Sequence, residues 1–145
     1  MTKIKRHAIV EFSAQQIYAL VNDVAAYPEF LPWCASSEIL QQTDNTMVAT
    51  LEVQKGKFRQ AFTTENKLDE PNSIIMQLKN GPFKELRGEW HFIVLHEHAC
   101  KVTFELDFAF NNKILALILD PLFKQMANTM ITAFSKRAED VYGEN

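Results

Sequence analysis

The chain has 145 residues, of which 47% are hydrophobic and 23% are charged, and its formal net charge is −3. This length predicts a single domain over residues 1–145 that builds a full hydrophobic core without a disulfide or a metal. Because acidic and basic residues are mixed along the chain, there is no global basic field for DNA, and a nucleic-acid role would need a local basic patch.

The first elements are a strand and a helix. Loosely alternating apolar residues predict a strand over Lys3–Phe12. Ser13 and Gln16 have the spacing of a capping box, which predicts a helix start. Pro28 and Pro32 then leave room for at most one short helical turn between them. The apolar stripe of the first helix is Ile17, Leu20, Val21 and Val24.

About six consecutive antiparallel strands are expected next, because apolar residues alternate with polar ones between turn signals. Residues 102–110 show the clearest alternation, which predicts a sheet with one apolar and one wet face. The expected strands cover residues 38–42, 47–54, 58–66, 74–78, 83–95 and 102–110.

From Asn111 the apolar period changes to 3.6, which predicts a long amphipathic helix ending near Gly143. Pro121, in the pair Asp120-Pro121, is expected to kink or split this helix. No other element is long enough to cover the apolar face of the sheet. The sequence therefore predicts an α+β fold with a groove between sheet and helix. The apolar stripe of the helix is Leu115, Leu119, Leu122, Met126, Met130 and Phe134.

A cytoplasmic location is expected. The longest unbroken apolar run, Ile114–Leu119, has six residues, whereas a membrane span needs about 20. The N-terminal apolar stretch is too short for a signal peptide. Cys34 and Cys100 form no Cys-x-x-Cys motif, which favours reduced thiols.

Few residues suggest a catalytic or metal-binding role, and the sequence contains no phosphate loop, nucleophile elbow or zinc motif. His96 and His98 share a strand face, but two ligands are too few for a metal, so a polar strand end is favoured. Cys34 has no neighbouring base, which favours an inert buried thiol. No His, Asp or Glu falls clearly in an apolar phase, so no general acid or base is nominated.

The 11 Phe, against 3 Tyr and 2 Trp, predict either a Phe-rich core or an apolar pocket. Some polar residues lie on the same strand face as Phe58 and Phe62 and could orient a ligand in a pocket. The favoured interpretation is that they form hydrogen bonds with neighbouring side chains. Met126 and Met130 would suit a flexible lipid, although ordinary helix core is favoured. The polar residues in question are Gln60, Thr64 and Asn66.

Three stretches carry a family resemblance. The chain resembles the coenzyme Q-binding branch of the START (polyketide cyclase-like) superfamily along its whole length, and within that branch it is most similar to bacterial ribosome-association toxins. The pair Asp120-Pro121 departs from the pattern. The stretches are Tyr27-Pro28-x-Phe30-Leu31-Pro32-x-Cys34, Gly81-Pro82-Phe83-Lys84-x-Leu86-x-Gly88-x-Trp90-x-Phe92, and Phe104-x-Leu106-Asp107-Phe108 through Arg137-Ala138-x-x-Val141-Tyr142.

The resemblance implies a helix-grip fold with a tunnel for a polyprenyl quinone such as ubiquinone. The cyclase label of the superfamily implies catalysis for some members, but no catalytic residue can be carried over to this sequence and no metal is expected. The leading hypothesis is therefore a non-enzymatic lipid-binding protein that supports respiratory quinone function. An irregular segment would gate the tunnel, touch a membrane interface or plug the core; its large residues are Tyr27, Phe30, Leu31 and Trp33. The candidate lining residues are Phe62, Trp90, Phe92, Phe104, Phe108, Met126, Met130 and Phe134.

Two alternatives remain. The toxin relatives imply binding to the large ribosomal subunit and a block of subunit association, which would inhibit translation initiation. A cyclase or dehydratase acting on a polyketide is the weakest reading, because it needs an acid/base pair inside the tunnel. Peripheral contact with the inner membrane would accompany the quinone role. Candidate phosphate contacts, which equally fit solvated strand faces, are Lys3, Lys5, Arg6, Lys55, Lys57 and Arg59.

Overall fold

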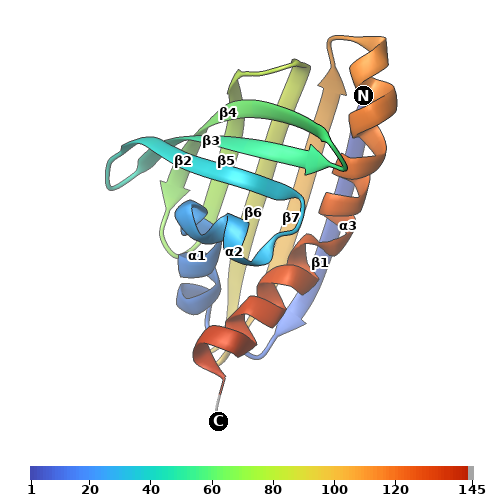
Figure 1. The fold of residues 1–145 in the computed structure, drawn as a ribbon. Helices are drawn as coiled ribbons and strands as arrows, with labels where there is room; N and C mark the ends of the chain where they lie inside the picture. Colours follow the sequence, from blue (N-terminus) through green and yellow to red (C-terminus); the bar gives the residue numbers. More distant parts are fainter. Residues whose placement is uncertain (144–145) are drawn as a thin grey trace.

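A computed structural model describes residues 1–143 and shows one antiparallel sheet wrapped around a long C-terminal helix (Figure 1). The predicted α+β arrangement is confirmed. The strands are β1 (Thr2–Val10), β2 (Cys34–Gln42), β3 (Thr46–Lys55), β4 (Phe58–Asp69), β5 (Ser73–Asn80), β6 (Phe83–His96) and β7 (Ala99–Phe110). The helices are α1 (Ala14–Asn22), the 3-10 turn η1 (Val24–Ala26), α2 (Tyr27–Phe30) and α3 (Lys113–Tyr142).

The strand order in the sheet is β1-β7-β6-β5-β4-β3-β2. Strands β2 to β7 follow one another as hairpins, and β1 pairs with β7 at the far edge. Register shifts interrupt several of these ladders, including those between β2 and β3 and between β6 and β7. Such bulges bend a strand and increase its twist, which helps the sheet curve around α3.

The N-terminal helix begins where the sequence predicts. The Ser13 hydroxyl accepts a hydrogen bond from the Gln16 amide at 3.1 Å, and the Gln16 side chain accepts one from the Ser13 amide at 2.9 Å. Both bonds satisfy amides that the helix itself leaves unpaired, so the capping box is confirmed. Helix α2 is the single short turn expected beside Pro28, which lies in its first turn, where a missing amide hydrogen costs little.

A kink or a split is expected at Pro121, and the split does not occur, because helix α3 continues from Lys113 to Tyr142. Proline removes the hydrogen bond to the carbonyl four residues earlier, which is that of Leu117. Leu117 is 79% exposed, so the proline lies where the helix borders water and not in the core.

Helix α3 is also long and apolar enough to cross a membrane by length and composition alone, with a mean hydropathy of 1.2 over an 18-residue window. In this structure it packs on β1, β7 and α1, and 39% of that window is buried. The core helix of a sheet-and-helix fold meets the same criterion, because it too is apolar along most of one side.

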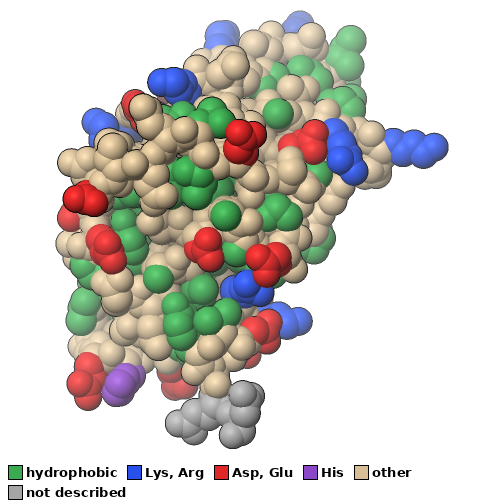
Figure 2. All heavy atoms as spheres, turned by 60° about the vertical axis from the view of Figure 1, so that its left-hand side comes forward, with side chains coloured by type: hydrophobic (Ala, Val, Ile, Leu, Met, Phe, Trp, Pro, Cys, Tyr) green, Lys and Arg blue, Asp and Glu red, His purple; other side chains and the backbone are tan. Residues whose placement is uncertain are grey.

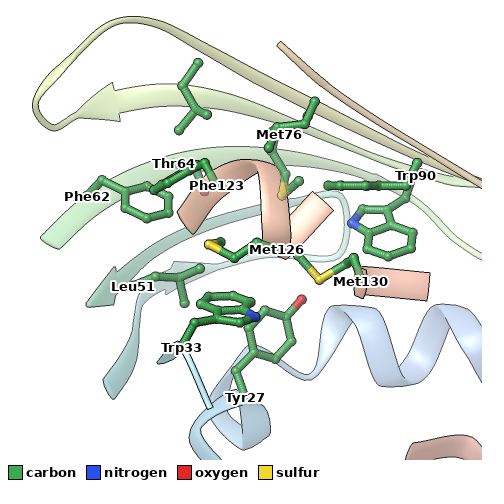
Figure 3. Close-up of a pocket in the computed structure, with 14 residues that line it drawn as sticks. Tyr27, Trp33, Leu51, Phe62, Thr64, Met76, Trp90, Phe123, Met126 and Met130 are labelled. Atoms are coloured by element: carbon green, nitrogen blue, oxygen red, sulfur yellow. The ribbon is translucent and has the colours of Figure 1, made fainter. Parts of the chain in front are cut away.

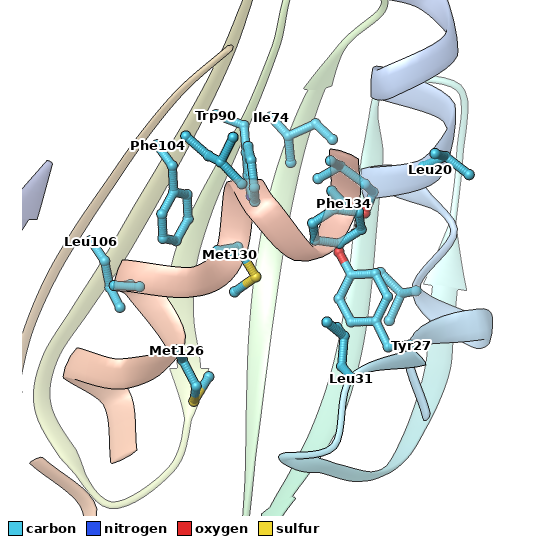
Figure 4. Packing of buried hydrophobic residues seen from close by; sticks show 14 of the residues in the cluster. Leu20, Tyr27, Leu31, Ile74, Trp90, Phe104, Leu106, Met126, Met130 and Phe134 are labelled. Carbon is cyan, nitrogen blue, oxygen red and sulfur yellow. The ribbon is translucent and has the colours of Figure 1, made fainter. Parts of the chain in front are cut away.

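Aromatic rings fill the space between α3 and the sheet in two clusters. In the Phe123 cluster, the α3 ring lies 5.3 to 5.8 Å from four other rings, namely those of Phe62, Phe83, Phe108 and Phe110. In the Phe134 cluster, the α3 ring lies 5.3 to 5.5 Å from three others, those of Tyr27, Phe30 and Trp90. Figure 4 shows the second cluster, with Phe134 beside Tyr27. Most of the phenylalanines are therefore core residues.

Candidate functional site

A cavity of about 60 Å³ lies between α3 and the concave face of the sheet, between the two aromatic clusters. Met126 and Met130 of α3 converge on it from one side and Met76 of β5 from the other (Figure 3). Its wall is almost entirely apolar. The lining residues are Tyr27, Trp33, Leu51, Phe62, Thr64, Met76, Leu86, Gly88, Trp90, Phe104, Leu106, Phe123, Met126 and Met130.

Gly88 shapes the sheet side of the cavity. It pairs with Met76 on β5 and with Leu106 on β7. A Cβ atom at Gly88 would collide with the terminal methyl group of Met76. The missing side chain therefore leaves space that the flexible Met76 side chain occupies, which is the close approach that a mid-strand glycine predicts.

Two polar groups of the wall, the Thr64 and Tyr27 hydroxyls, already have hydrogen-bond partners. The Thr64 hydroxyl donates to the Asn66 side-chain oxygen at 2.8 Å, and both residues are buried. The Tyr27 hydroxyl donates to the Val21 carbonyl, and burial raises the pKa of this phenol. Gln60 lies outside the cavity wall and is half-buried. The favoured interpretation, in which these polar residues bond to their neighbours, is therefore confirmed for Thr64 and Asn66.

A second hollow adjoins the cavity on the outer side of α3. This groove has a volume of about 290 Å³ and shares Trp33 and Met126 with the cavity, so these two side chains separate the inner space from the outer one. Two bonds fix the segment that carries Trp33: the Gln54 amide donates to the Trp33 carbonyl at 2.8 Å, and the Gln54 side chain donates to the Pro32 carbonyl at 2.9 Å. The other residues of the groove are Leu122, Gln125 and Thr129.

Five of the eight candidate lining residues reach the cavity and three do not. Those that line it are Phe62, Trp90, Phe104, Met126 and Met130. Phe92 instead packs edge-on against Tyr18 of α1, and Phe108 belongs to the Phe123 cluster. Phe134 is held among three rings of its own cluster. These three point toward the same core as the cavity, but other side chains fill the space in front of them.

Of the four candidate gate residues, two line the cavity and two lie elsewhere. Tyr27 and Trp33 line the cavity. Leu31 is only 1% exposed and lies in the core, so it plugs the interior. Phe30 packs against Phe134 and lies under the Arg137 guanidinium, whose carbon is 4.8 Å from the ring centroid. The segment thus lines the cavity at two positions and plugs the core at Leu31, while gating and membrane contact stay predictions.

Several lining residues were not nominated from the sequence. Met76, Leu86, Leu106 and Phe123 lie in inward phases of their strands or on the stripe of the last helix, so periodicity includes them. Periodicity does not rank them above Phe92 or Phe108, because it reports which face a residue occupies and not its depth along that face. Leu51, half-buried on β3, completes the set.

The cysteines and histidines show no sign of chemistry. Burial raises the pKa of the Cys34 thiol to about 11 and also raises that of Cys100, so both thiols are protonated at neutral pH. His96 ends β6, and His98 is exposed in the following turn. Within residues 1–143, no group of three or more His, Cys, Asp or Glu could hold a metal ion. Of the described lining residues, none carries a carboxylate or an imidazole.

Three of the six candidate basic residues flank the exposed side of α3. Arg6 of β1 donates to the side chain of Asn128 on α3, whereas Lys3 and Lys5 pair in register with Asp107 and Glu105 and point to the convex face of the sheet. The β3–β4 hairpin lies on the opposite flank, since Gln54 next to its tip shares the outer groove with α3 residues (Figure 1). Lys55 and Lys57 lie at this tip, whereas Arg59 shares a strand face with Lys67 and also points to the convex face.

The family model described as polyketide cyclase / dehydrase and lipid transport matches residues 10–135. A ribosome association toxin from Pseudomonas aeruginosa is 48% identical, covering 98% of this chain and 99% of that protein. Its counterpart from Vibrio cholerae is 47% identical, covering 99% of this chain and 100% of that protein. The mitochondrial coenzyme Q-binding protein COQ10 of Dictyostelium discoideum is 26% identical, covering 94% and 68% respectively.

Two solved structures show the same architecture. An 18 kDa protein from Caulobacter crescentus is 30% identical with a TM-score of 0.77, covering 99% of this chain and 100% of that one. The Zhui aromatase/cyclase from Streptomyces has a TM-score of 0.83 at 18% identity, covering 95% and 93%. The likeness to the Zhui aromatase/cyclase shows the fold alone. Together these findings confirm the helix-grip fold and the family resemblance that the sequence predicts.

Proposed function

Because the chain belongs to the polyketide cyclase / dehydrase and lipid transport family, and nearly half of its residues match ribosome association toxins, we propose that it associates with the ribosome. The observation that carries this proposal is the 47% identity to the Vibrio cholerae toxin over 144 residues, since a likeness of that extent includes surface as well as core. The partner is the large ribosomal subunit, in the cytoplasm.

The structure supplies a surface suited to this role, which we call the α3 outer face. It comprises the exposed helix residues Pro121, Lys124, Gln125, Asn128 and Thr129, framed by Arg6 of β1 and by Lys55 and Lys57 at the tip of the β3–β4 hairpin. Lysine and arginine contacts to phosphate dominate the affinity of proteins for nucleic acid, so these flanks fit ribosomal RNA.

One of the cations on this face is paired with an acidic residue, since Lys124 lies 2.9 Å from Asp120. An exposed ion pair of this kind contributes at most about 1 kcal/mol. Lys124 can therefore exchange its partner for an RNA phosphate at little cost, and binding needs no change in the fold.

Sedimentation tests the proposal. A lysate containing the overexpressed wild-type protein should show more free subunits and fewer 70S ribosomes, and the protein should sediment with the large subunit. The double variant Lys55→Glu/Lys57→Glu should lose most of this association, because it reverses two exposed charges at the hairpin tip. The matched control, Lys67→Glu/Lys101→Glu, makes the same charge change on strand positions of the convex sheet face. Unchanged ribosome profiles with the wild-type protein would refute the proposal.

A second candidate function is non-enzymatic binding of an apolar ligand, for which we propose a prenyl lipid such as ubiquinone. It rests on the apolar cavity and on the 26% identity to a coenzyme Q-binding protein. The cavity holds about 60 Å³, whereas a cavity of about 150 Å³ is needed to bind benzene. A quinone ring therefore requires Trp33 and the α3 methionines to move outward. Mass spectrometry of organic extracts, with and without added ubiquinone, tests this candidate, and a lipid-free protein that takes up no quinone would exclude it.

A further inference from the structure

The first turns of α3 carry the two most exposed apolar side chains of that helix. Ile114 is 69% exposed and Leu117 is 79% exposed, whereas Leu119, Phe123 and Phe134 are at most 2% exposed. These side chains follow directly on the last strand, at the end of the sheet where β7 leads into α3. Ile114 and Leu117 are three residues apart and therefore neighbours on one helix face, and exposed apolar side chains rimmed by polar residues mark interaction sites.

Lysines surround these apolar turns. Lys84 and Lys113 lie beside one surface groove of about 330 Å³, which Ala116 also lines. The sheet register brings two more lysines to this end, because Phe83 pairs with Phe110 and Thr2 with Phe108. We call this surface the basic end; its residues are Lys3, Lys79, Lys84, Lys113, Ile114 and Leu117.

The opposite end of the molecule carries the opposite charge. Glu70 receives a hydrogen bond from Gln15, and the Tyr142 hydroxyl donates to the Gln16 carbonyl, which places the β4–β5 turn and the C-terminal part of α3 beside α1. The acidic residues near this end are Glu11, Asp69, Glu70, Glu97, Glu139 and Asp140. On the face shown in Figure 2, Lys and Arg side chains gather at the upper end beside hydrophobic ones, and acidic side chains prevail below.

We propose that the basic end docks on the surface of an anionic lipid bilayer. Ile114 and Leu117 would insert at the level of the headgroups, and the lysines around them would contact lipid phosphates. Apolar side chains inside a ring of lysines are the pattern of an interfacial anchor, in which apolar burial and charge attraction act together. This proposal is independent of ribosome association.

The chemistry of the basic end favours lipid over the other occupants. A second copy of the chain docking here through the same patch would set lysines against lysines, which is repulsive. Sequence-specific RNA recognition stacks unpaired bases on aromatic rings or arginine guanidinium groups, and the six residues of the basic end include neither. Exposed aliphatic side chains gain nothing against a phosphate backbone, but they gain free energy inside a bilayer.

The groove beside the cavity lies on the same side of α3 as the exposed apolar turns. Ile114 and Gln125 are eleven residues apart, which is close to a whole number of helical turns, so they share a face. Gln125 lines the outer groove, where Trp33 and Met126 close the cavity. When the protein is docked, the closed mouth of its cavity would thus lie about 16 Å from the membrane surface, measured along the axis of α3.

Vesicle flotation with the full chain tests the proposal. The wild-type protein should float with vesicles of phosphatidylcholine and phosphatidylglycerol, and not with phosphatidylcholine alone. Ile114→Ser/Leu117→Ser should weaken binding at least about tenfold, because it removes the inserted side chains. Lys84→Gln/Lys113→Gln should weaken it about 25-fold, at about fivefold per lysine.

The matched control is Ile9→Ser/Val94→Ser, which removes two exposed apolar side chains, 68% and 62% exposed, near the acidic end. This variant should float like the wild-type protein. No flotation of the wild-type protein, or an equal loss in the control, would overturn the proposal. So would an Ile114→Ser/Leu117→Ser variant that floats normally but no longer sediments with ribosomes, since the basic end would then be a ribosome contact.

Discussion

The two sides of α3 differ in how ready they are to bind a partner. The inner side packs Phe123 and Phe134 into aromatic clusters and leaves only about 60 Å³ of free space between them. The outer side is open, polar and framed by basic residues. A ligand on the inner side requires side chains to move, whereas a partner on the outer side meets a surface that already exists. The fold can therefore serve ribosome association without using its cavity.

The largest expected effect is on stability, and it compares a tightly packed residue of the inner side with one that borders the cavity. Phe123→Ala should lower the free energy of unfolding by about 3–5 kcal/mol, because it removes a ring that touches four others. Met126→Ala should cost only about 2 kcal/mol, because this side chain already borders free space. Urea denaturation of both variants measures the difference. Equal losses would mean that the cavity is as tightly packed as the cluster.

The next effect is the salt dependence of binding, which should differ between the outer and the inner side of α3. If four phosphates are contacted, raising salt from about 50 to about 200 mM should weaken ribosome association about a hundredfold. Uptake of an apolar ligand into the cavity should change little, because apolar burial does not depend on ion pairs. Binding titrations at both salt concentrations check this prediction, and a salt-independent association would contradict phosphate contacts.

The smallest effect concerns a buried thiol at the end of the segment that carries Trp33. The folded Cys34 keeps its proton up to a pKa of about 11, whereas the unfolded thiol loses it near 9.0. Between these values the unfolded state binds fewer protons, so stability should fall as pH rises, by at most about 1.4 kcal/mol per pH unit. Chemical denaturation between pH 8 and pH 11 measures the slope. Cys34→Ala should show a smaller slope, and an identical one would contradict a buried thiol.

The sequence predicts the elements of this fold well, because local physics sets them. The Ser13 and Gln16 capping box and the alternation in β7 are properties of a few consecutive residues. At Pro121 the sequence leaves a kink and a split open, and only the packing of α3 decides that the helix continues.

The candidate site was harder to predict. Phe92 and Phe104 share an apolar strand face, yet only Phe104 reaches the cavity, because α1 places Tyr18 against Phe92. Similarly, nothing local shows that Arg6 and Lys57 flank one helix. Both facts depend on how distant elements meet, and periodicity carries no information about that.

Lysine footprinting tests the central claim, that the α3 outer face binds the ribosome, most directly. An amine-reactive reagent is added to the protein with and without purified large ribosomal subunits, and labelling of each lysine is measured by mass spectrometry. The account predicts that Lys55, Lys57 and Lys124 become protected, while Lys67 and Lys101 on the convex sheet face keep their reactivity. Protection of Lys67 and Lys101 with none at Lys55 and Lys57 would contradict it.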